Sequence, residues 1–142
     1  RPASTQPTQD LAGMLAKARA RKAYDELIES ELAAWLAGRS AEFDLIVSAD
    51  TLCYFGALEQ ALAGAAGALR PGGRVVFTVE RAGDDVAAYH LDSTGRYSHA
   101  VSYVRAVLAS SGLDEIAIEH VVLRKERGQE VHGLLASASR PE

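Results

Sequence analysis

Two continuous β-prone runs near the middle of the chain constrain its fold more than any other feature. One lies in "FDLIVSAD" (43–50) and the other in "RVVFTVE" (74–80). Unbroken apolar runs of this length are typical of strands buried on both faces of a parallel sheet, whereas a half-exposed strand alternates apolar and polar residues. We therefore expect both segments to be buried strands.

The sequence between these runs predicts a helix. "ALEQALAGAAGAL" (57–69) is rich in Ala and Leu, and its larger apolar residues recur at helical spacing. "LRPGG" (69–73) then predicts the end of this helix at Pro71 and a tight turn that uses the backbone freedom of Gly72 and Gly73. Strand, helix and strand together predict a βαβ unit with parallel strands.

The residues before this unit predict a flexible start and two helices. Residues 1–9 are polar and rich in Pro, Ser and Thr, so we expect a flexible N-terminal segment, with a single domain over residues 10–142. Residues 10–23 and 31–39 have helical patterns, and Gly38 ends the second of them. The segment between these helices, "YDELIES", is short, and its apolar residues suit a helical turn.

The residues after this unit predict one more helix and a closing hairpin. Residues 81–100 form a long polar connection, and residues 100–113 have apolar positions on one helical face. "DEIAIEHVVL" (114–123) and "EVHGLLASAS" (130–139) predict two strands, joined through a turn that contains Gly128. The fold class is therefore α/β, with a parallel centre and an antiparallel hairpin at its C-terminal end.

Composition excludes several classes of protein. The formal net charge of −4 disfavours nucleic acid as a partner, and the basic run "LRKERG" contains a Glu and predicts a solvated turn. The single cysteine, Cys53, excludes an internal disulfide and is expected to be a buried apolar residue. No apolar run approaches the ~20 residues of a membrane helix, and the histidines lack metal-ligand spacing. We expect a cytoplasmic protein without a membrane partner or a metal.

Three ordered segments carry a resemblance to a known family. They are "FDLIVSADTLCYFGALEQAL", "LRPGGRVVFTVE" and "GRYSHAVSYVRAVLASSGL". Together they resemble the C-terminal two-thirds of a class I S-adenosylmethionine-dependent methyltransferase, of the type often fused to tetratricopeptide repeats. The resemblance covers about residues 10–142 and implies a Rossmann-like sheet, S-adenosylmethionine as cofactor, and a small-molecule or protein methyl acceptor.

The resemblance implies a cofactor site at the carboxyl ends of the strands. Ser48, Ala49 and Asp50 would line the methionine side of the cofactor. Asp50 is equally placed to cap the next helix, and the helix dipole explains an acidic residue at Glu31 as well as adenine binding does. The residues that the resemblance assigns to the cofactor are Asp10, Met14, Glu31, Leu32, Ser48, Ala49 and Asp50.

The resemblance places the methyl acceptor beside "YFG" (54–56) and "GRYSHA" (95–100). Tyr54 would shield the sulfonium carbon, and His99 would serve as a general base. Arg96 and Tyr97 would contact the acceptor with them. In the alternative interpretation, the "YFG" residues are ordinary core and the "GRYSHA" residues begin a helix.

One departure from the family pattern leads to a second functional hypothesis. The glycine-rich loop that approaches the cofactor has no counterpart, because no Gly-x-Gly occurs in the sequence. The chain therefore resembles an N-terminally incomplete domain, and the alternative is a truncated or degenerate methyltransferase that acts as an interaction module. An incomplete sheet leaves strand edges open, so a homodimer or a strand-supplying partner is expected, and the N-terminal helix is expected to pack more weakly than residues 43–137.

Overall fold

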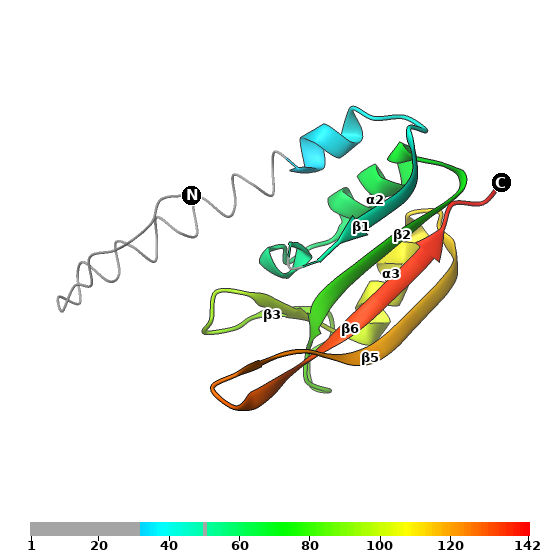
Figure 1. Ribbon diagram of the computed structural model, residues 1–142. Coiled ribbons are helices and arrows are strands. Elements are labelled where there is room, and N and C mark those ends of the chain that lie inside the picture. Colours follow the sequence, from blue (N-terminus) through cyan, green and yellow to red (C-terminus); the bar gives the residue numbers. More distant parts are fainter. Residues whose placement is uncertain (1–31, 50) are drawn as a thin grey trace, which may run out of the picture.

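The computed structural model describes residues 32–49 and 51–142 (Figure 1). In this part of the chain, six strands form one mixed sheet with the order β3-β4-β2-β6-β5, and β1 also pairs with β2. The pairs β1–β2 and β2–β4 are parallel, and the other pairs are antiparallel. The mixed α/β fold is therefore confirmed. The expectations for residues 1–31, including the N-terminal helix and its packing, lie outside the described residues.

The predicted βαβ unit is present. β1 (Phe43–Ser48) leads through the short helix η1 (Leu52–Tyr54) to α2 (Glu59–Ala68), and β2 (Leu69–Arg81) returns parallel to β1. The apolar stripe of α2 is buried against the sheet, and Cys53 is buried as expected. Residues 32–37 are helical and Gly38 follows in a turn, which confirms the described part of that prediction.

The predicted role of Pro71 in ending α2 is wrong. The helix ends at Ala68, and Leu69 is already extended, with a ψ of 142° and a fully buried side chain. The pairing of β1 with β2 shifts between Phe43↔Leu69 and Leu45↔Arg74, so the following residues form an irregularity within the strand. Gly72 adopts a φ of +84°, as its predicted role requires.

The predicted polar connection over residues 81–100 is instead a β-hairpin. β3 (Tyr89–Leu91) pairs antiparallel with β4 (Tyr97–His99), and β4 lies parallel to the end of β2, with Ser98 opposite Glu80. Sequence reasoning missed the hairpin because three-residue strands are too short to show a period. The hairpin extends the sheet beyond the carboxyl end of β1.

The C-terminal part of the chain follows the prediction with longer strands. α3 (Val101–Ser110) buries one face, and Gly112 follows it with a φ of +85°. β5 (Asp114–Glu126) and β6 (Gln129–Ser139) form the antiparallel hairpin. The turn between them is shorter than predicted, because only Arg127 and Gly128 lie outside the strands, both with positive φ.

The helices α2 and α3 lie on the same face of the sheet. Val75, Phe77 and Val79 alternate along β2 and share one buried cluster with residues of α2 and α3 (Figure 1). On the opposite face, Leu45 and Val47 of β1 are 57% and 64% exposed. The expectation that β1 is buried on both faces is therefore wrong for the described residues. None of the helices described here is long and apolar enough to cross a membrane.

Candidate functional site

The carboxyl ends of β1 and β2 lie at one edge of the sheet, because the two strands are parallel. Ser48 ends β1, Ala49 follows it, and η1 begins three residues later. At the end of β2, Glu80 lies beside the β3–β4 hairpin through its pairing with Ser98. In open α/β sheets, this edge is where ligands bind.

An apolar pocket of about 370 Å³ opens beside the carboxyl end of β1. It lies between the helix at residues 32–37, β1 and α2, and its volume is within the range of small-molecule sites. Leu32, Ser48 and Ala49, three of the residues predicted to bind a cofactor, line it together. The other predicted cofactor residues, Asp10, Met14, Glu31 and Asp50, lie outside the described residues.

The pocket contains a polar atom that lacks a partner. Ser48 Oγ is buried and makes no hydrogen bond in the described structure. A buried hydroxyl without a partner costs free energy, so a ligand or water that offers it a donor or acceptor is favoured at this position. Trp35 also lines the pocket, with its ring half exposed and the Arg39 guanidinium 4.4 Å from the ring centroid. The pocket therefore offers apolar walls, an aromatic face and one unsatisfied hydroxyl, a combination typical of small-molecule sites.

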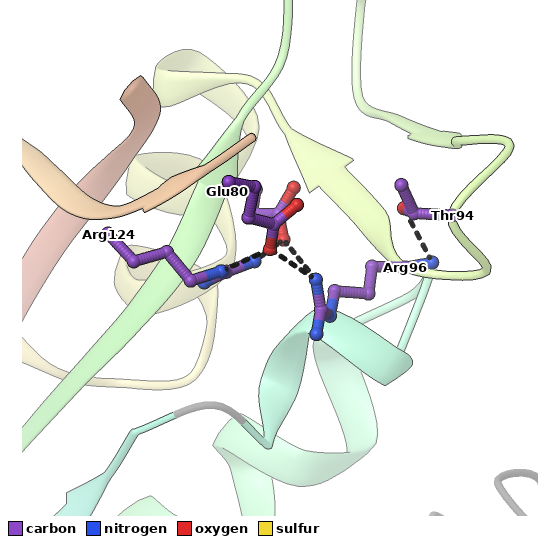
Figure 2. Close-up of polar contacts among 5 residues, drawn as sticks. Glu80, Thr94, Arg96 and Arg124 are labelled. Carbon is purple, nitrogen blue, oxygen red and sulfur yellow. Dashed lines mark hydrogen bonds and ion pairs between the residues drawn. The ribbon is translucent and has the colours of Figure 1, made fainter. Parts of the chain in front are cut away.

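A network of four charged side chains lies at the carboxyl end of β2 (Figure 2). Arg124 Nη2 lies 2.6 Å from Glu80 Oε2, and Arg124 Nε lies 2.6 Å from Glu126 Oε2. From the β3–β4 hairpin, Arg96 Nη1 lies 3.1 Å from Glu126 Oε2 and 3.9 Å from Glu80 Oε2. Two arginines and two glutamates thus join β2, β4 and β5 with no net charge.

The pKa values in the network favour its charged forms. Hydrogen bonding to Glu126 is the main cause of the raised pKa of Arg124, and hydrogen bonding to Arg124 is the main cause of the lowered pKa of Glu126. A hydrogen bond with Tyr54 is the main cause of the raised pKa of Arg96. Tyr54 and Arg96, both predicted acceptor contacts, are therefore brought together although they are far apart in the sequence.

The prediction that "LRKERG" is a solvated turn is wrong for Arg124 and Glu126. Both residues lie in β5, and their side chains belong to the charged network. The missed signal is the spacing of these two residues, since positions i and i+2 of a strand point to the same face. A predicted strand that continued three residues further, to Glu126, would have placed both charges beside the end of β2.

Tyr97 and His99 lie in β4, and the structure places them in an aromatic cluster. The ring of His99 lies 6.1 Å from that of Tyr89 and 6.2 Å from that of Tyr103, between centroids, and the rings of Tyr89 and Tyr97 lie 5.9 Å apart. His99 is fully buried, and this burial is the main cause of its lowered pKa. The alternative interpretation of "YFG" as core holds for Phe55, which is buried, while Tyr54 is partly exposed.

No candidate metal centre is present in the described part of the chain. Within residues 32–49 and 51–142, no group of three or more His, Cys, Asp or Glu residues is placed to hold a metal ion.

Residues 10–77 match the family model described as a methyltransferase domain. No curated protein matches the chain in sequence.

Several solved structures share the fold at low sequence identity. Phosphoethanolamine N-methyltransferase 2 of Haemonchus contortus, in complex with phosphomonomethylethanolamine and S-adenosylhomocysteine, aligns over 73% of this chain with a TM-score of 0.59 and 12% identity. A methyltransferase of Methanosarcina mazei described as S-adenosylmethionine-dependent aligns over 72% with a TM-score of 0.57 and 14% identity. The 1,6-didemethyltoxoflavin N1-methyltransferase of Burkholderia thailandensis, with bound 1,6-didemethyltoxoflavin and S-adenosylhomocysteine, aligns over 75% with a TM-score of 0.54 and 17% identity.

The chain spans only part of these structures. It covers 35% of the Haemonchus protein, 61% of the Methanosarcina protein and 48% of the Burkholderia protein. At identities of this size, the likeness shows a shared fold.

Proposed function

We propose that the chain carries a partial class I S-adenosylmethionine-dependent methyltransferase domain and takes part in methyl transfer from S-adenosylmethionine to a small-molecule or protein nucleophile. The observation that carries this proposal is the pocket at the carboxyl end of β1. It unites Leu32, Ser48 and Ala49, which the family resemblance assigns to the cofactor, with the unpartnered Ser48 hydroxyl.

The residues of the pocket hold and orient the cofactor. Leu32 and Trp35 supply apolar and aromatic contact, and Ser48 Oγ supplies a hydrogen bond at the end of β1. When bound, the cofactor supplies a methyl group on a positively charged sulfur. Direct displacement depends mainly on proximity and orientation, so the site needs few dedicated catalytic side chains.

The acceptor side is proposed at Tyr54 and Arg96. Their contact places a phenol and a guanidinium next to the end of β2, beside the network of Glu80 and Arg124. Tyr54 lies only six residues after the end of β1, and this nearness supports a role for its aromatic face in covering the methyl group that would react. Tyr97, on the same hairpin as Arg96, is proposed as a further acceptor contact.

Filling the pocket tests this proposal. Ala49 lines the pocket and is exposed, so Ala49→Trp would place an indole in the cofactor's volume without disturbing the core. We expect binding of S-adenosylhomocysteine to weaken by about tenfold or more, which corresponds to about 1.4 kcal/mol, in equilibrium dialysis. Ala57→Trp is the control, because Ala57 is also exposed but does not line this pocket. Equal binding by both variants would contradict the assignment of the pocket.

The open edge of β1 favours a second candidate function, that of an interaction module. In the described part of the chain, β1 pairs with β2 alone, and Leu45 and Val47 expose most of their side chains beside that edge. An unpaired strand edge with apolar neighbours is a template for another strand. We propose a second copy of the chain, or a strand-supplying partner, at this edge. A cytoplasmic location stays a prediction.

A further inference from the structure

Two tyrosine rings of the β3–β4 hairpin pack directly on the backbone of Gly56, which lies between η1 and α2. A Cβ atom added at Gly56 would lie 2.8 Å from the ring of Tyr89 and 2.9 Å from the ring of Tyr97. Cβ atoms do not make contacts this short, so the packing requires a glycine. The hairpin and the segment after Tyr54 are therefore in contact at the atomic level.

His99 adds a directional bond to this contact. Its Nε2 atom lies 2.9 Å from the carbonyl oxygen of Gly56. Because a carbonyl oxygen can only accept, Nε2 must carry the proton and donate it. The hydrogen bond thus fixes His99 as the Nε2–H tautomer, with the Nδ1 lone pair unprotonated.

The second ring nitrogen faces no hydrogen-bond partner. Nδ1 is buried and unpaired in the described structure, and the residue as a whole is 0% exposed. The groups packed against the ring are Tyr89 from β3 and Tyr103 from α3. Tyr103 hydrogen-bonds to Glu59 of α2, and burial is the main cause that raises its pKa to about 12, so it stays neutral at ordinary pH. Burial lowers the pKa of His99 and outweighs the opposite effect of hydrogen bonding to the backbone of Gly56 and Phe55.

We propose that His99 is a positioning residue, which holds the Gly56 carbonyl and thereby fixes Tyr54 and the end of β1 against the β3–β4 hairpin. This inference replaces the role of general base predicted for His99, and its importance for catalysis rests on the proposed methyl transfer. Nε2 donates its proton to the Gly56 carbonyl, and Nδ1 is buried. Neither nitrogen can therefore take a proton from a methyl acceptor in this arrangement.

The first test measures the state of His99 in the wild-type protein and needs no cofactor. Nitrogen-15 NMR of the histidine rings should show an Nε2–H tautomer for His99, with protonation only below the ordinary pKa of about 6.5, because burial lowers the pKa of this ring. An Nδ1–H tautomer, or titration at the ordinary pKa, would overturn the proposal. This outcome is independent of whether the protein binds S-adenosylmethionine.

The second test separates positioning from proton transfer. His99→Gln can retain a donor near the position of Nε2, whereas His99→Leu leaves the Gly56 carbonyl unpaired. We expect His99→Gln to bind S-adenosylhomocysteine within about threefold of wild type and His99→Leu to bind about tenfold more weakly, or to unfold. His132→Gln, at a side chain that is 62% exposed, is the matched control and should bind as wild type does. Wild-type affinity in His99→Leu would overturn the proposal, while absence of binding in every protein would overturn the proposed function instead.

The pH dependence of stability gives a third readout. The unfolded chain binds a proton at His99 below about pH 6.5, whereas the folded chain does not until a lower pH. Stability from His99 is therefore fully present above about pH 6.5 and decreases as the pH falls below it. We expect the melting temperature of the wild type to fall more between pH 7 and pH 5 than that of His99→Gln. Parallel pH profiles would contradict the neutral, buried state of His99.

Discussion

Two glycines of the described chain differ in the space around them, and this difference can be measured. Gly56→Ala brings Cβ against two tyrosine rings, whereas at Gly67, within α2, an added Cβ meets nothing within 4 Å. We expect Gly56→Ala to lower the free energy of unfolding by about 1–3 kcal/mol. Gly67→Ala should raise it by about 0.5–1 kcal/mol, because Ala favours a helix interior. Urea denaturation measures both, and a neutral Gly56→Ala would show that the hairpin is not packed on Gly56.

Glu80 is the most enclosed member of the charged network, with a side chain that is 13% exposed. Glu80→Gln keeps its shape and removes its charge, so Arg124 loses one of its two carboxylate partners. We expect the free energy of unfolding to fall by about 1–3 kcal/mol in urea denaturation. Glu130→Gln, at a side chain that is 52% exposed, should change it by less than about 0.5 kcal/mol. Equal effects would show that the network adds nothing to stability.

At the scale of single residues, the sequence indicated candidate site residues more readily than the side chains that they contact. Tyr54 and Arg96 were predicted on one side of the site, and the structure brings them into contact. Arg124 was missed because the partner that defines its role, Glu80, is 44 residues away in the sequence. Long-range charge pairs leave no local pattern, so only the fold reveals them.

At the scale of elements, periodicity predicted α2, α3 and the β5–β6 hairpin, since each has enough residues to show a pattern. The β3–β4 hairpin was missed because each of its strands has three residues. β1 was predicted correctly as a strand, but the prediction that both of its faces are buried was wrong. A continuous apolar run shows only that both faces of a strand are suited to burial. In the described structure, one face of β1 is exposed.

The open edge of β1 leads to a prediction about assembly. Val47→Lys places a charge beside the edge, and we expect it to reduce self-association of the chain in sedimentation velocity over a range of concentrations. Val122→Lys is the matched control, because Val122 is 48% exposed on β5, at the other end of the sheet, and should leave association unchanged. A wild type that stays monomeric at every concentration would contradict the homodimer and leave a different strand as the partner.

At the scale of the whole molecule, the order of elements predicted the fold better than any single motif did. The α/β class is confirmed, and solved methyltransferase structures share the fold over about three quarters of the chain. Four of the predicted cofactor residues, Asp10, Met14, Glu31 and Asp50, lie outside the described residues. What the described part supplies is a pocket at the expected end of β1, lined by the three remaining predicted residues.

The central claim is that this pocket binds the cofactor, and calorimetric titration of the purified 142-residue chain with S-adenosylhomocysteine tests it most directly. We predict saturable binding with a Kd of about 100 μM or tighter, and a raised melting temperature in the presence of ligand, because binding to the folded state stabilises it. Absence of both heat and thermal shift at about 1 mM ligand would contradict the claim, since a Kd well above 1 mM leaves the site largely empty.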